Sequence, residues 1–311
     1  MDLPLNRFVK DLHRWYRHNK RDLPWRRTKD PYKILISEVM LQQTQVDRVV
    51  PKYELFLASF PTVQALASSS PARVIALWLG LGYNRRALSL HKGAKAVVET
   101  MNGNYPSTPD RLMEIPGIGP YTAAAVSSFA FNHDSAVVDT NVIRVLARVF
   151  IGKKAMNNSP WRKEFDKLAR DIMPPGASRI HNNAIMEFGA LVCQAKPSCG
   201  KCFAFSYCIG FQEMKQGSLS EKELELLGTP KGGFGTIQSR FEGSDRQIRG
   251  RIVGVLKGNS GLDKQGLFDH VQGCLQSPLV IDRFERILLK LEKEGMIECK
   301  GTVISLPHNQ L

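Results

Sequence analysis

Four of the six cysteines in this chain lie in one short segment, CQAKPSCGKCFAFSYC, with the spacing C-x5-C-x2-C-x5-C. Four thiolates in so compact a loop can hold a tetrahedral zinc ion or an iron–sulfur cluster, and the number of ligands does not distinguish the two. Four unligated buried cysteines are the alternative, but chance clustering this tight is rare. The expected metal ligands are Cys193, Cys199, Cys202 and Cys208.

Two carboxylates occupy positions where their protonation can be argued from the sequence. Glu38 lies in the middle of a predicted helix on an apolar stripe, so its pKa should be raised. Asp139 directly precedes an amphipathic helix, and the ordinary interpretation is a helix N-cap. Amide hydrogen bonds and the helix dipole should then keep Asp139 ionised at neutral pH. One protonated and one charged carboxyl are the pair that cleavage of a glycosidic bond requires.

A glycine-containing turn, IPGIGP, separates two predicted helices. Gly117 and Gly119 permit backbone conformations that other residues avoid and allow a ligand to approach closely. The amides at the start of the second helix form an anion site that one phosphate of a nucleic acid would fit, without reading sequence. A tight interhelical turn without a ligand is the alternative.

The charge balance favours a polyanionic partner. Lys and Arg number 43 against 29 Asp and Glu, a net charge of +14, although a solvated basic surface without function would look the same. No apolar run approaches the ~20 residues that cross a bilayer. The N-terminus lacks the layout of a secretory signal. We therefore expect an intracellular protein, cytoplasmic if the chain is bacterial, where clustered cysteines bind metal more often than they form disulfides.

The elements that must position these residues are mainly α-helical. Apolar residues recur at helical spacing as far as Cys208, and strand-like alternation is scarce before the C-terminal part. A Gly-rich, aperiodic stretch follows, and then three candidate helices and a short β-hairpin suggest a winged-helix-like α+β module. The predicted organisation is a metal-containing core at 1–212, a linker at 213–243 and the C-terminal module at 244–311.

Together with the cysteine loop, several motifs occur in the order seen in one family. They are LPWRR, DPYKILISEVMLQQTQV, WLGLGYNRRAL, IPGIGPYTAAAV and VVDTNVIRVLAR. Over roughly residues 5 to 210 the chain resembles the helix-hairpin-helix DNA glycosylase superfamily, and SEVMLQQTQV and LGLGY resemble adenine DNA glycosylases of the MutY type. The resemblance implies the family's two-lobed fold, a [4Fe–4S] cluster on the cysteine loop, and base-excision removal of adenine mispaired with guanine or 8-oxoguanine in double-stranded DNA. We expect the protein to act as a monomer.

The resemblance also assigns roles to individual residues. Glu38 would protonate adenine at N7, and Asp139 would stabilise the oxocarbenium-like sugar as the N-glycosidic bond breaks. Tyr121 stands where lyase-competent relatives carry a catalytic Lys, and a phenol forms no Schiff base. A monofunctional enzyme that leaves an abasic site is therefore expected, with Tyr121 helping to position the carboxylates. Residues matching the family's adenine pocket are Arg21, Trp25, Arg26, Asn141 and Glu187.

Adenine must leave the base stack before Glu38 can reach it, which costs a few kcal/mol. The family fills the resulting gap with residues that match Gln43, Thr44, Leu81 and Tyr83. An amide can hydrogen-bond the orphaned partner base, and an aromatic ring can wedge between bases. With Gly117 and Gly119, these residues form the expected DNA-binding set.

Three features depart from the family pattern. The first cysteine interval is five residues where six is usual, Asn84 replaces a second aromatic residue, and no MutT-like domain is recognisable after Gly228. Three other functions are the alternatives to adenine excision. A glycosylase removing thymine or uracil opposite guanine fits the same scaffold, whereas Tyr121 argues against an endonuclease III-like lyase. A non-catalytic DNA-damage-binding protein would need neither Glu38 nor Asp139.

Overall fold

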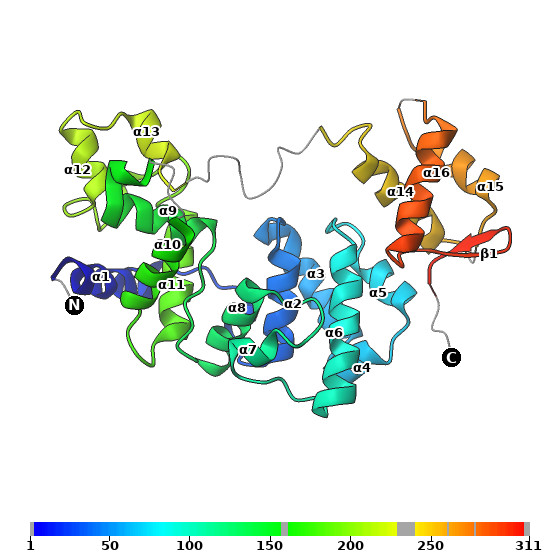
Figure 1. Ribbon diagram of the computed structural model, residues 1–311, viewed down its shortest axis with the longest axis horizontal. Coiled ribbons are helices and arrows are strands. Elements are labelled where there is room, and N and C mark those ends of the chain that lie inside the picture. The colour runs from blue at the N-terminus through cyan, green and yellow to red at the C-terminus, as the bar shows by residue number, and fades with distance from the viewer. Residues whose placement is uncertain (1–2, 157–160, 229–239, 260, 277, 308–311) are drawn as a thin grey trace. The chain divides into compact units, whose positions relative to one another are not determined.

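A computed structural model describes residues 3–156, 161–228, 240–259, 261–276 and 278–307 (Figure 1). The described residues are mainly helical, with one two-stranded antiparallel sheet near the C-terminus, as predicted. Among them, no helix combines the length and apolar character needed to span a membrane.

The chain divides into two compact units, and both are discontinuous in sequence. The first comprises Met1–Ile34, Ser107–Leu112 and Gly119–Thr236, and the second comprises Leu35–Pro106, Met113–Ile118 and Ile237–Leu311. This division runs through the predicted core of 1–212 and joins part of that core with the C-terminal module. Helix α2, Pro31–Leu41, begins in the first unit and continues into the second.

The first unit carries Asp139 and the cysteine loop. Its core is aromatic where α1 meets α11, with Phe8 and Phe188 both fully buried and their ring centroids 6.3 Å apart. Trp15 of α1 adds an edge contact to Phe188 at 5.5 Å. The α-helices of this unit are α1 Leu3–Asn19, α7 Pro109–Leu112, α8 Pro120–Phe131, α9 Thr140–Leu146, α10 Trp161–Asp171, α11 Ser178–Leu191, α12 Ile209–Lys215 and α13 Glu221–Leu226.

Shorter helical turns complete the first unit, and its helices extend into the predicted linker. Leu219, Leu224 and Leu227 form a small buried cluster there, because α12 and α13 fold back onto the unit. Residues 229–239 of the predicted linker lie outside the described residues. The short turns are the 3-10 segments Pro24–Arg26, Gly152–Met156 and Cys199–Lys201, and the π-helical turn Ala147–Ile151.

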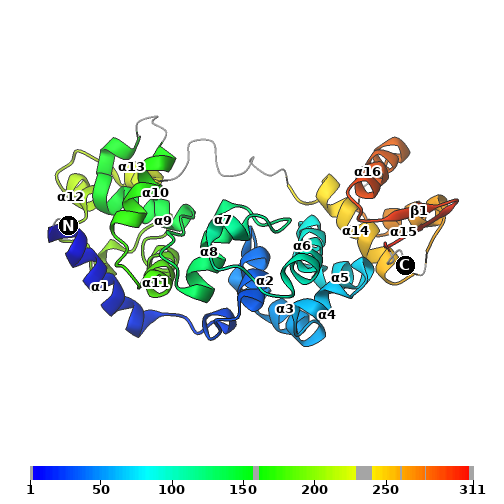
Figure 2. The same cartoon turned by 60° about the horizontal axis from the view of Figure 1, so that its bottom comes forward.

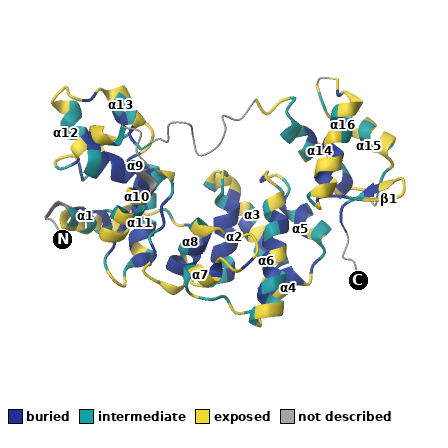
Figure 3. Ribbon diagram, in the orientation of Figure 1, coloured by how far each residue is buried: buried dark blue, intermediate teal, exposed yellow. Residues whose placement is uncertain are grey.

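The second unit carries Glu38 on α2, which is buried along almost its whole length (Figure 3). Helices α4 and α6 pack side by side in this unit (Figure 2). Thr62 and Ser70 cap α4 and α5 by accepting hydrogen bonds from backbone amides, as short polar side chains do at helix N-termini. The remaining helices are α3 Val46–Ser59, α4 Val63–Ala67, α5 Pro71–Trp78, α6 Arg85–Met101, α14 Asp245–Lys257, α15 Lys264–Gly273 and α16 Ile281–Lys293.

The three C-terminal helices and hairpin predicted from the sequence are confirmed. Strands β1, Glu298–Lys300, and β2, Val303–Ser305, pair antiparallel, with Cys299 opposite Ile304. This C-terminal part shares its apolar core with the remainder of the second unit.

Side chains and backbone connect the C-terminal part to α5 and α6. Ile75 of α5 and Leu88 of α6 belong to the same buried cluster as the apolar residues of α14, α15 and α16. The backbone N–H of Ala72 donates to the carbonyl of Pro307 at 2.9 Å. Glu294 forms ion pairs with Arg249 and with Arg85. The C-terminal part therefore packs as an integral portion of the second unit.

Deleting residues 244–311 should selectively destabilise the second unit. Ile75 and Leu88 would become exposed, and each buried side chain of this size contributes about 1.5–3 kcal/mol. Hydrogen exchange should show lost protection in α5 and α6 with α8 and α11 little changed. Val280→Ala, at a side chain that is 63% exposed, is the matched control within the C-terminal part. Unchanged protection of α5 and α6 would show that they do not depend on the C-terminal part.

Candidate active site and cysteine loop

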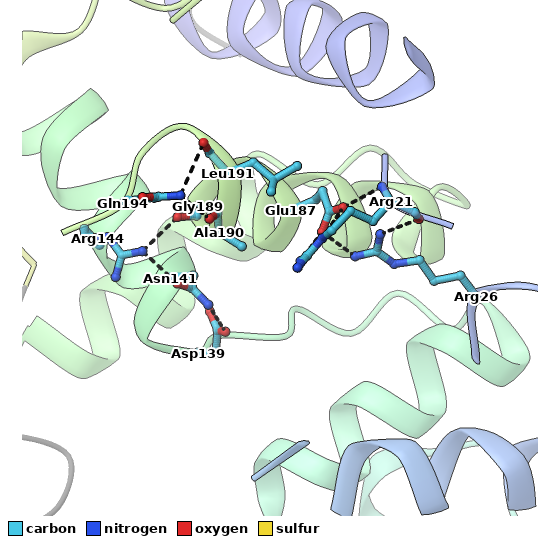
Figure 4. Close-up of polar contacts among 10 residues, drawn as sticks. All are labelled: Arg21, Arg26, Asp139, Asn141, Arg144, Glu187, Gly189, Ala190, Leu191 and Gln194. Carbon is cyan, nitrogen blue, oxygen red and sulfur yellow. Dashed lines mark hydrogen bonds and ion pairs between the residues drawn. The ribbon is translucent and has the colours of Figure 1, made fainter. Parts of the chain in front are cut away.

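Asp139 caps helix α9, as the sequence predicts. Its Oδ1 accepts a hydrogen bond from the backbone N–H of Val142 at 2.8 Å. Its Oδ2 accepts one from the side-chain amide of Asn141 at 2.9 Å (Figure 4). Since each oxygen has its own donor, the carboxylate is held in one orientation.

The ionisation of Asp139 differs from the expectation based on helix capping alone. Burial raises the pKa of Asp139 above its usual value, although the hydrogen bonds from Val142 and Asn141 and the charge of Arg144 act to lower it. Capping interactions are local and can be read from the sequence, whereas desolvation depends on what the folded chain packs around the carboxyl group. The carboxylate form of Asp139 therefore carries a cost in solvation that its hydrogen bonds and Arg144 offset only in part.

Arg144 connects Asp139 to the start of the cysteine loop. Its Nη2 donates to Oδ1 of Asn141 at 2.7 Å and to the carbonyl of Gly189 at 2.9 Å (Figure 4). Its Nε donates to the carbonyl of Cys193 at 2.7 Å. These bonds fix the amide of Asn141, because its oxygen is occupied by Arg144 and its nitrogen is left to face Asp139. A side chain at 189 is excluded, because its Cβ would lie 2.8 Å from the Cβ of Asn141.

Arg144 is not among the site residues predicted from the sequence. A signal was present, because Arg144 follows Asn141 by three residues in the predicted helix and so shares its face. The partners at Gly189 and Cys193 lie 45 and 49 residues away in sequence, beyond what helical spacing can indicate.

A second polar cluster brings together Glu187, Arg21 and Arg26, three of the predicted pocket residues (Figure 4). Arg21 donates to Glu187 through its backbone N–H, Nε and Nη2, and Arg26 donates through Nη2 at 2.8 Å. Burial alone would raise the pKa of Glu187, but the hydrogen bonds from Arg26 and Arg21 lower it to about 2. Both carboxylate oxygens are used by the arginines, so Glu187 orients these two side chains.

Arginine nitrogens in this cluster remain available to a ligand. Nε of Arg26 and Nη1 of Arg179 are buried and have no hydrogen-bond partner among the described residues. Arg179, which is not among the residues predicted from the sequence, donates through its other terminal nitrogen to the carbonyls of Arg26 and Thr28. Trp25 is buried on the 3-10 turn Pro24–Arg26, next to Arg26 in sequence. Tyr121 lies in the first turn of α8.

Glu38 and the predicted gap-filling residues belong to the second unit. Glu38 is only 6% exposed, as its apolar stripe predicts. Gln43 and Tyr83 are exposed, and both adopt left-handed backbone conformations, with φ of 55° and 49°. Leu81 is buried, so the structure does not bring it to the surface with them. Thr44 is half-buried, and its hydroxyl donates to the carbonyl of Gln42.

The two glycines of the IPGIGP turn differ in their requirements. Gly117 has φ of +87°, and a Cβ there would lie 2.9 Å from the Cβ of Ser89, so no other residue fits. Gly119 has φ of −92°, which any residue adopts, and it precedes α8 as its N-cap. The predicted conformational need for glycine therefore applies at 117 and not at 119. At Gly119 the absence of a side chain leaves open space beside the backbone.

The four clustered cysteines line one pocket in the first unit. Cys193 and Cys208 are buried, Cys199 and Cys202 are half-buried, and none of the four forms a disulfide. Arg148, only 1% exposed, lies beside them. It donates to the carbonyls of Gln194 and Ala195 in the cysteine loop and to those of Leu224 and Glu225 in α13. These bonds tie the loop to α13.

Burial suppresses the ionisation of two thiols in this pocket. It raises the pKa of Cys202 to about 12 and that of Cys208 to about 12. A bound metal requires thiolates, so binding would release protons from these groups.

Similarity to known proteins identifies the class of DNA repair protein to which the chain belongs. Residues 36–171 match the HhH-GPD superfamily of base excision DNA repair proteins. A thermostable thymine-DNA glycosylase is 31% identical, with a TM-score of 0.63 over 68% of this chain and 97% of its own. Endonuclease III in a non-covalent DNA complex has a TM-score of 0.59 over 70% of this chain and all of its own. At 22% identity that likeness shows the fold alone.

Relatives of known activity identify the family within this superfamily. The adenine DNA glycosylase of Mycolicibacterium smegmatis is 38% identical over 290 residues, which are 93% of this chain and 92% of that protein. The adenine DNA glycosylase of Rattus norvegicus is 43% identical over 72% of this chain, which spans only 44% of the rat protein. The chain belongs to the adenine DNA glycosylase family, which confirms the family predicted from the motifs.

Asp139→Asn should change how stability depends on pH. Because the folded-state pKa of Asp139 is raised, its favourable contribution is complete below the unfolded value of 3.8 and is lost as pH rises through the folded value. The variant has no such loss, so its free energy of unfolding relative to wild type should increase as pH rises from about 4 to 8. Urea unfolding across this range measures the difference.

The matched control is Asp47→Asn, which removes one negative charge from the exposed first turn of α3. A difference between Asp139→Asn and wild type that stays constant with pH would contradict the raised pKa.

Proposed function

We propose that this chain is a monofunctional adenine DNA glycosylase that hydrolyses the N-glycosidic bond of adenine mispaired with guanine or 8-oxoguanine and leaves an abasic site. Membership of the adenine DNA glycosylase family supports the activity. The observation that carries the chemistry is the geometry of Asp139, a desolvated carboxylate held by two separate donors.

Asp139 would act on the sugar. Positive charge develops on the deoxyribose as the bond to adenine breaks. A carboxylate that has already lost much of its hydration interacts more strongly with that charge than a solvated one would, because the local dielectric is low. The attraction is absent in the neutral ground state, so it stabilises the transition state selectively.

Glu38 would act on the base. Its position on the buried face of α2 suits a carboxyl group that keeps a proton and donates it to N7 of adenine. The protonated base then departs as a neutral leaving group, and water completes the hydrolysis. Tyr121 offers no amine to attack the sugar, so strand cleavage through a Schiff base is not expected.

Recognition of the extruded adenine is assigned to the cluster around Glu187. Glu187 holds Arg21 and Arg26 in place, and Nε of Arg26 is a buried donor able to meet an acceptor on the base. Trp25 would supply apolar packing, and Asn141 would act through Asp139.

Double-stranded DNA is the proposed partner. The net charge of +14 favours phosphate binding, and the open space at Gly119 admits a backbone phosphate at the start of α8. Gln43 and Tyr83 are the exposed side chains assigned to the gap left by the extruded base, and Leu81 and Thr44 would support their loops. We propose that the protein acts as a monomer.

Excision of thymine or uracil opposite guanine is the second candidate, because a thymine-DNA glycosylase is among the similar structures. That protein is 31% identical, whereas the rat and human adenine DNA glycosylases are 43% and 40% identical. The family therefore favours adenine as the substrate.

Single-turnover base release tests the assignment directly. Duplexes pairing A with G or with 8-oxoguanine should be cleaved after alkali treatment, whereas T·G and U·G duplexes should be inert. Glu38→Gln and Asp139→Asn should each slow adenine release by about 10²-fold or more, because each removes a group acting in the transition state. Both variants should still bind duplex, which controls for folding. Faster release of thymine than adenine, or wild-type rates in Asp139→Asn, would refute the mechanism.

We also propose that the cysteine loop holds a [4Fe–4S] cluster, with a structural role. Four sulfurs bound to one zinc at 2.3 Å would lie about 3.8 Å apart. Among the described residues, no group of three or more Cys, His, Asp or Glu is gathered closely enough to hold a single ion. The four thiols line one shared pocket, which is the arrangement that a four-cysteine cluster needs. When bound, the cluster would crosslink Cys193, Cys199, Cys202 and Cys208.

Purified protein should show the visible absorption of an iron–sulfur chromophore, and iron analysis should find it in the protein. Cys202→Ala should lose the colour and melt at a lower temperature, because the loop loses a crosslink. Cys274→Ala, at an exposed cysteine in the C-terminal part, is the control and should retain both. A colourless protein containing stoichiometric zinc would contradict the cluster assignment.

A further inference from the structure

Arg86, in the first turn of α6, contacts two loops that are far apart in sequence. We call residues 42–45, between α2 and α3, the Gln43 loop, and residues 79–84, between α5 and α6, the Tyr83 loop. The guanidinium Nη1 donates to the carbonyl of Gln42 at 2.6 Å. Nη2 donates to the hydroxyl of Thr44 at 3.2 Å and to the carbonyl of Gly82 at 3.0 Å.

The same side chain also caps the C-terminus of helix α2. Nη1 of Arg86 donates to the carbonyls of Val39 at 2.7 Å and Met40 at 3.1 Å, in the last turn of that helix. Helix C-termini leave such carbonyls without intrahelical partners, and a cation there also interacts favourably with the helix dipole. The guanidinium carbon lies 5.4 Å from the ring centre of Trp78 and 5.6 Å from that of Tyr83.

Cationic side chains donate hydrogen bonds to the backbone carbonyls of the Tyr83 loop. Lys52 and Arg48, both from α3, donate to the carbonyls of Leu79 and Gly80. Arg86 donates to the carbonyls of Leu81 and Gly82, and its Nε donates to that of Tyr83. All five consecutive carbonyls from 79 to 83 therefore accept a hydrogen bond from a cation, which determines the path of the loop.

The backbone of both loops needs such support. Gln43 and Tyr83 have φ of 55° and 49°, a conformation that costs about 1–2 kcal/mol for a residue other than glycine. Conformations of this kind persist only where surrounding contacts over-determine them. Arg86 contacts both loops, and the hydroxyl of Thr44, to which Arg86 donates, in turn donates to the carbonyl of Leu81 at 3.5 Å.

We propose that Arg86 is a positioning residue that holds the Gln43 loop and the Tyr83 loop as one pre-formed unit. The proposal rests on the proposed function, in which Gln43 and Tyr83 occupy the gap left by the extruded adenine. Holding both side chains in place before DNA binds removes the ordering cost from the extrusion step. Arg86 therefore promotes base extrusion without touching the base.

A phosphate-binding role for Arg86 is the competing interpretation. The donors of Arg86 are already directed at carbonyl and hydroxyl oxygens of the protein. Burial lowers the pKa of Arg86 to about 10, so the group remains charged at neutral pH and its charge is stabilised by these oxygens. Arg86 is therefore surrounded by neutral oxygens, an arrangement that suits holding the loops in place and not pairing with a phosphate.

The test compares Arg86→Gln and Arg86→Lys with Arg85→Gln. Arg85 is the matched control, because it is the neighbouring arginine, its side chain is 72% exposed, and it lies 4.0 Å from Glu294. Extrusion is followed by the fluorescence of 2-aminopurine placed beside the target adenine. Both Arg86 variants should lower the extrusion equilibrium at least roughly tenfold, since two or more charge-assisted hydrogen bonds are lost. Lysine keeps the charge but cannot reproduce the planar fork.

Two further readouts separate positioning from general damage and from phosphate contact. Adenine placed opposite an abasic site is already poorly stacked and paired, so its release should suffer less in Arg86→Gln than release from an A·G pair. The slope of log K against log salt should match wild type. An equal loss on both substrates, a slope reduced by about 0.9, or wild-type behaviour of Arg86→Lys would each overturn the proposal.

Hydrogen exchange in the free protein provides a test that needs no DNA. Amides of residues 42–45 and 79–84 should both exchange faster in Arg86→Gln and Arg86→Lys, and neither should change in Arg85→Gln. Acceleration in one loop only would refute the connection between them. If the wild-type protein released no base from any duplex, the proposed function would fail while the exchange result still decided the role of Arg86.

Discussion

The solvation cost of an ionised Asp139 inside the protein is the constraint that shapes the site in the first unit. A buried carboxylate loses hydration, and burial accordingly raises its pKa. Donors from α9 and Asn141 offset part of this cost, and Arg144 holds Asn141 while reaching the first cysteine of the loop. The close approach of α11 that allows this arrangement requires glycine at 189. The contacts that stabilise the fold here are therefore the contacts that orient the charge.

Arginines with different partners organise the polar contacts within each of the two units. Arg21 and Arg26 are oriented by the carboxylate of Glu187, whose pKa they lower to about 2. Arg86 and Arg148 are instead directed at carbonyl oxygens, and each fixes a loop that lacks regular structure of its own. A guanidinium group suits this role because it presents five donors in a rigid plane and stays charged when buried.

The C-terminal part contributes to the second unit through packing. Its helices bury Ile75 and Leu88, which lie on either side of the Tyr83 loop in sequence, and Glu294 pairs with Arg85. The similarity to the mycobacterial adenine DNA glycosylase extends over 93% of the chain, so this part of the protein is included in it. The C-terminal helices and the two helices that flank the Tyr83 loop, α5 and α6, therefore share one apolar core.

The sequence by itself determined what depends on local spacing. The helical pattern, the cap at Asp139, the C-terminal helices and hairpin, and the motifs that identify the family could all be predicted from neighbouring residues. Tertiary structure alone decided which way burial moves the pKa of Asp139, that Leu81 is buried while Tyr83 is exposed, and that helices continue past Lys215. It also decided the roles of Arg144 and Arg86, whose partners at Cys193 and Met40 lie 49 and 46 residues away. Desolvation and long-range hydrogen bonds exist only after distant segments have packed together, so no local pattern contains them.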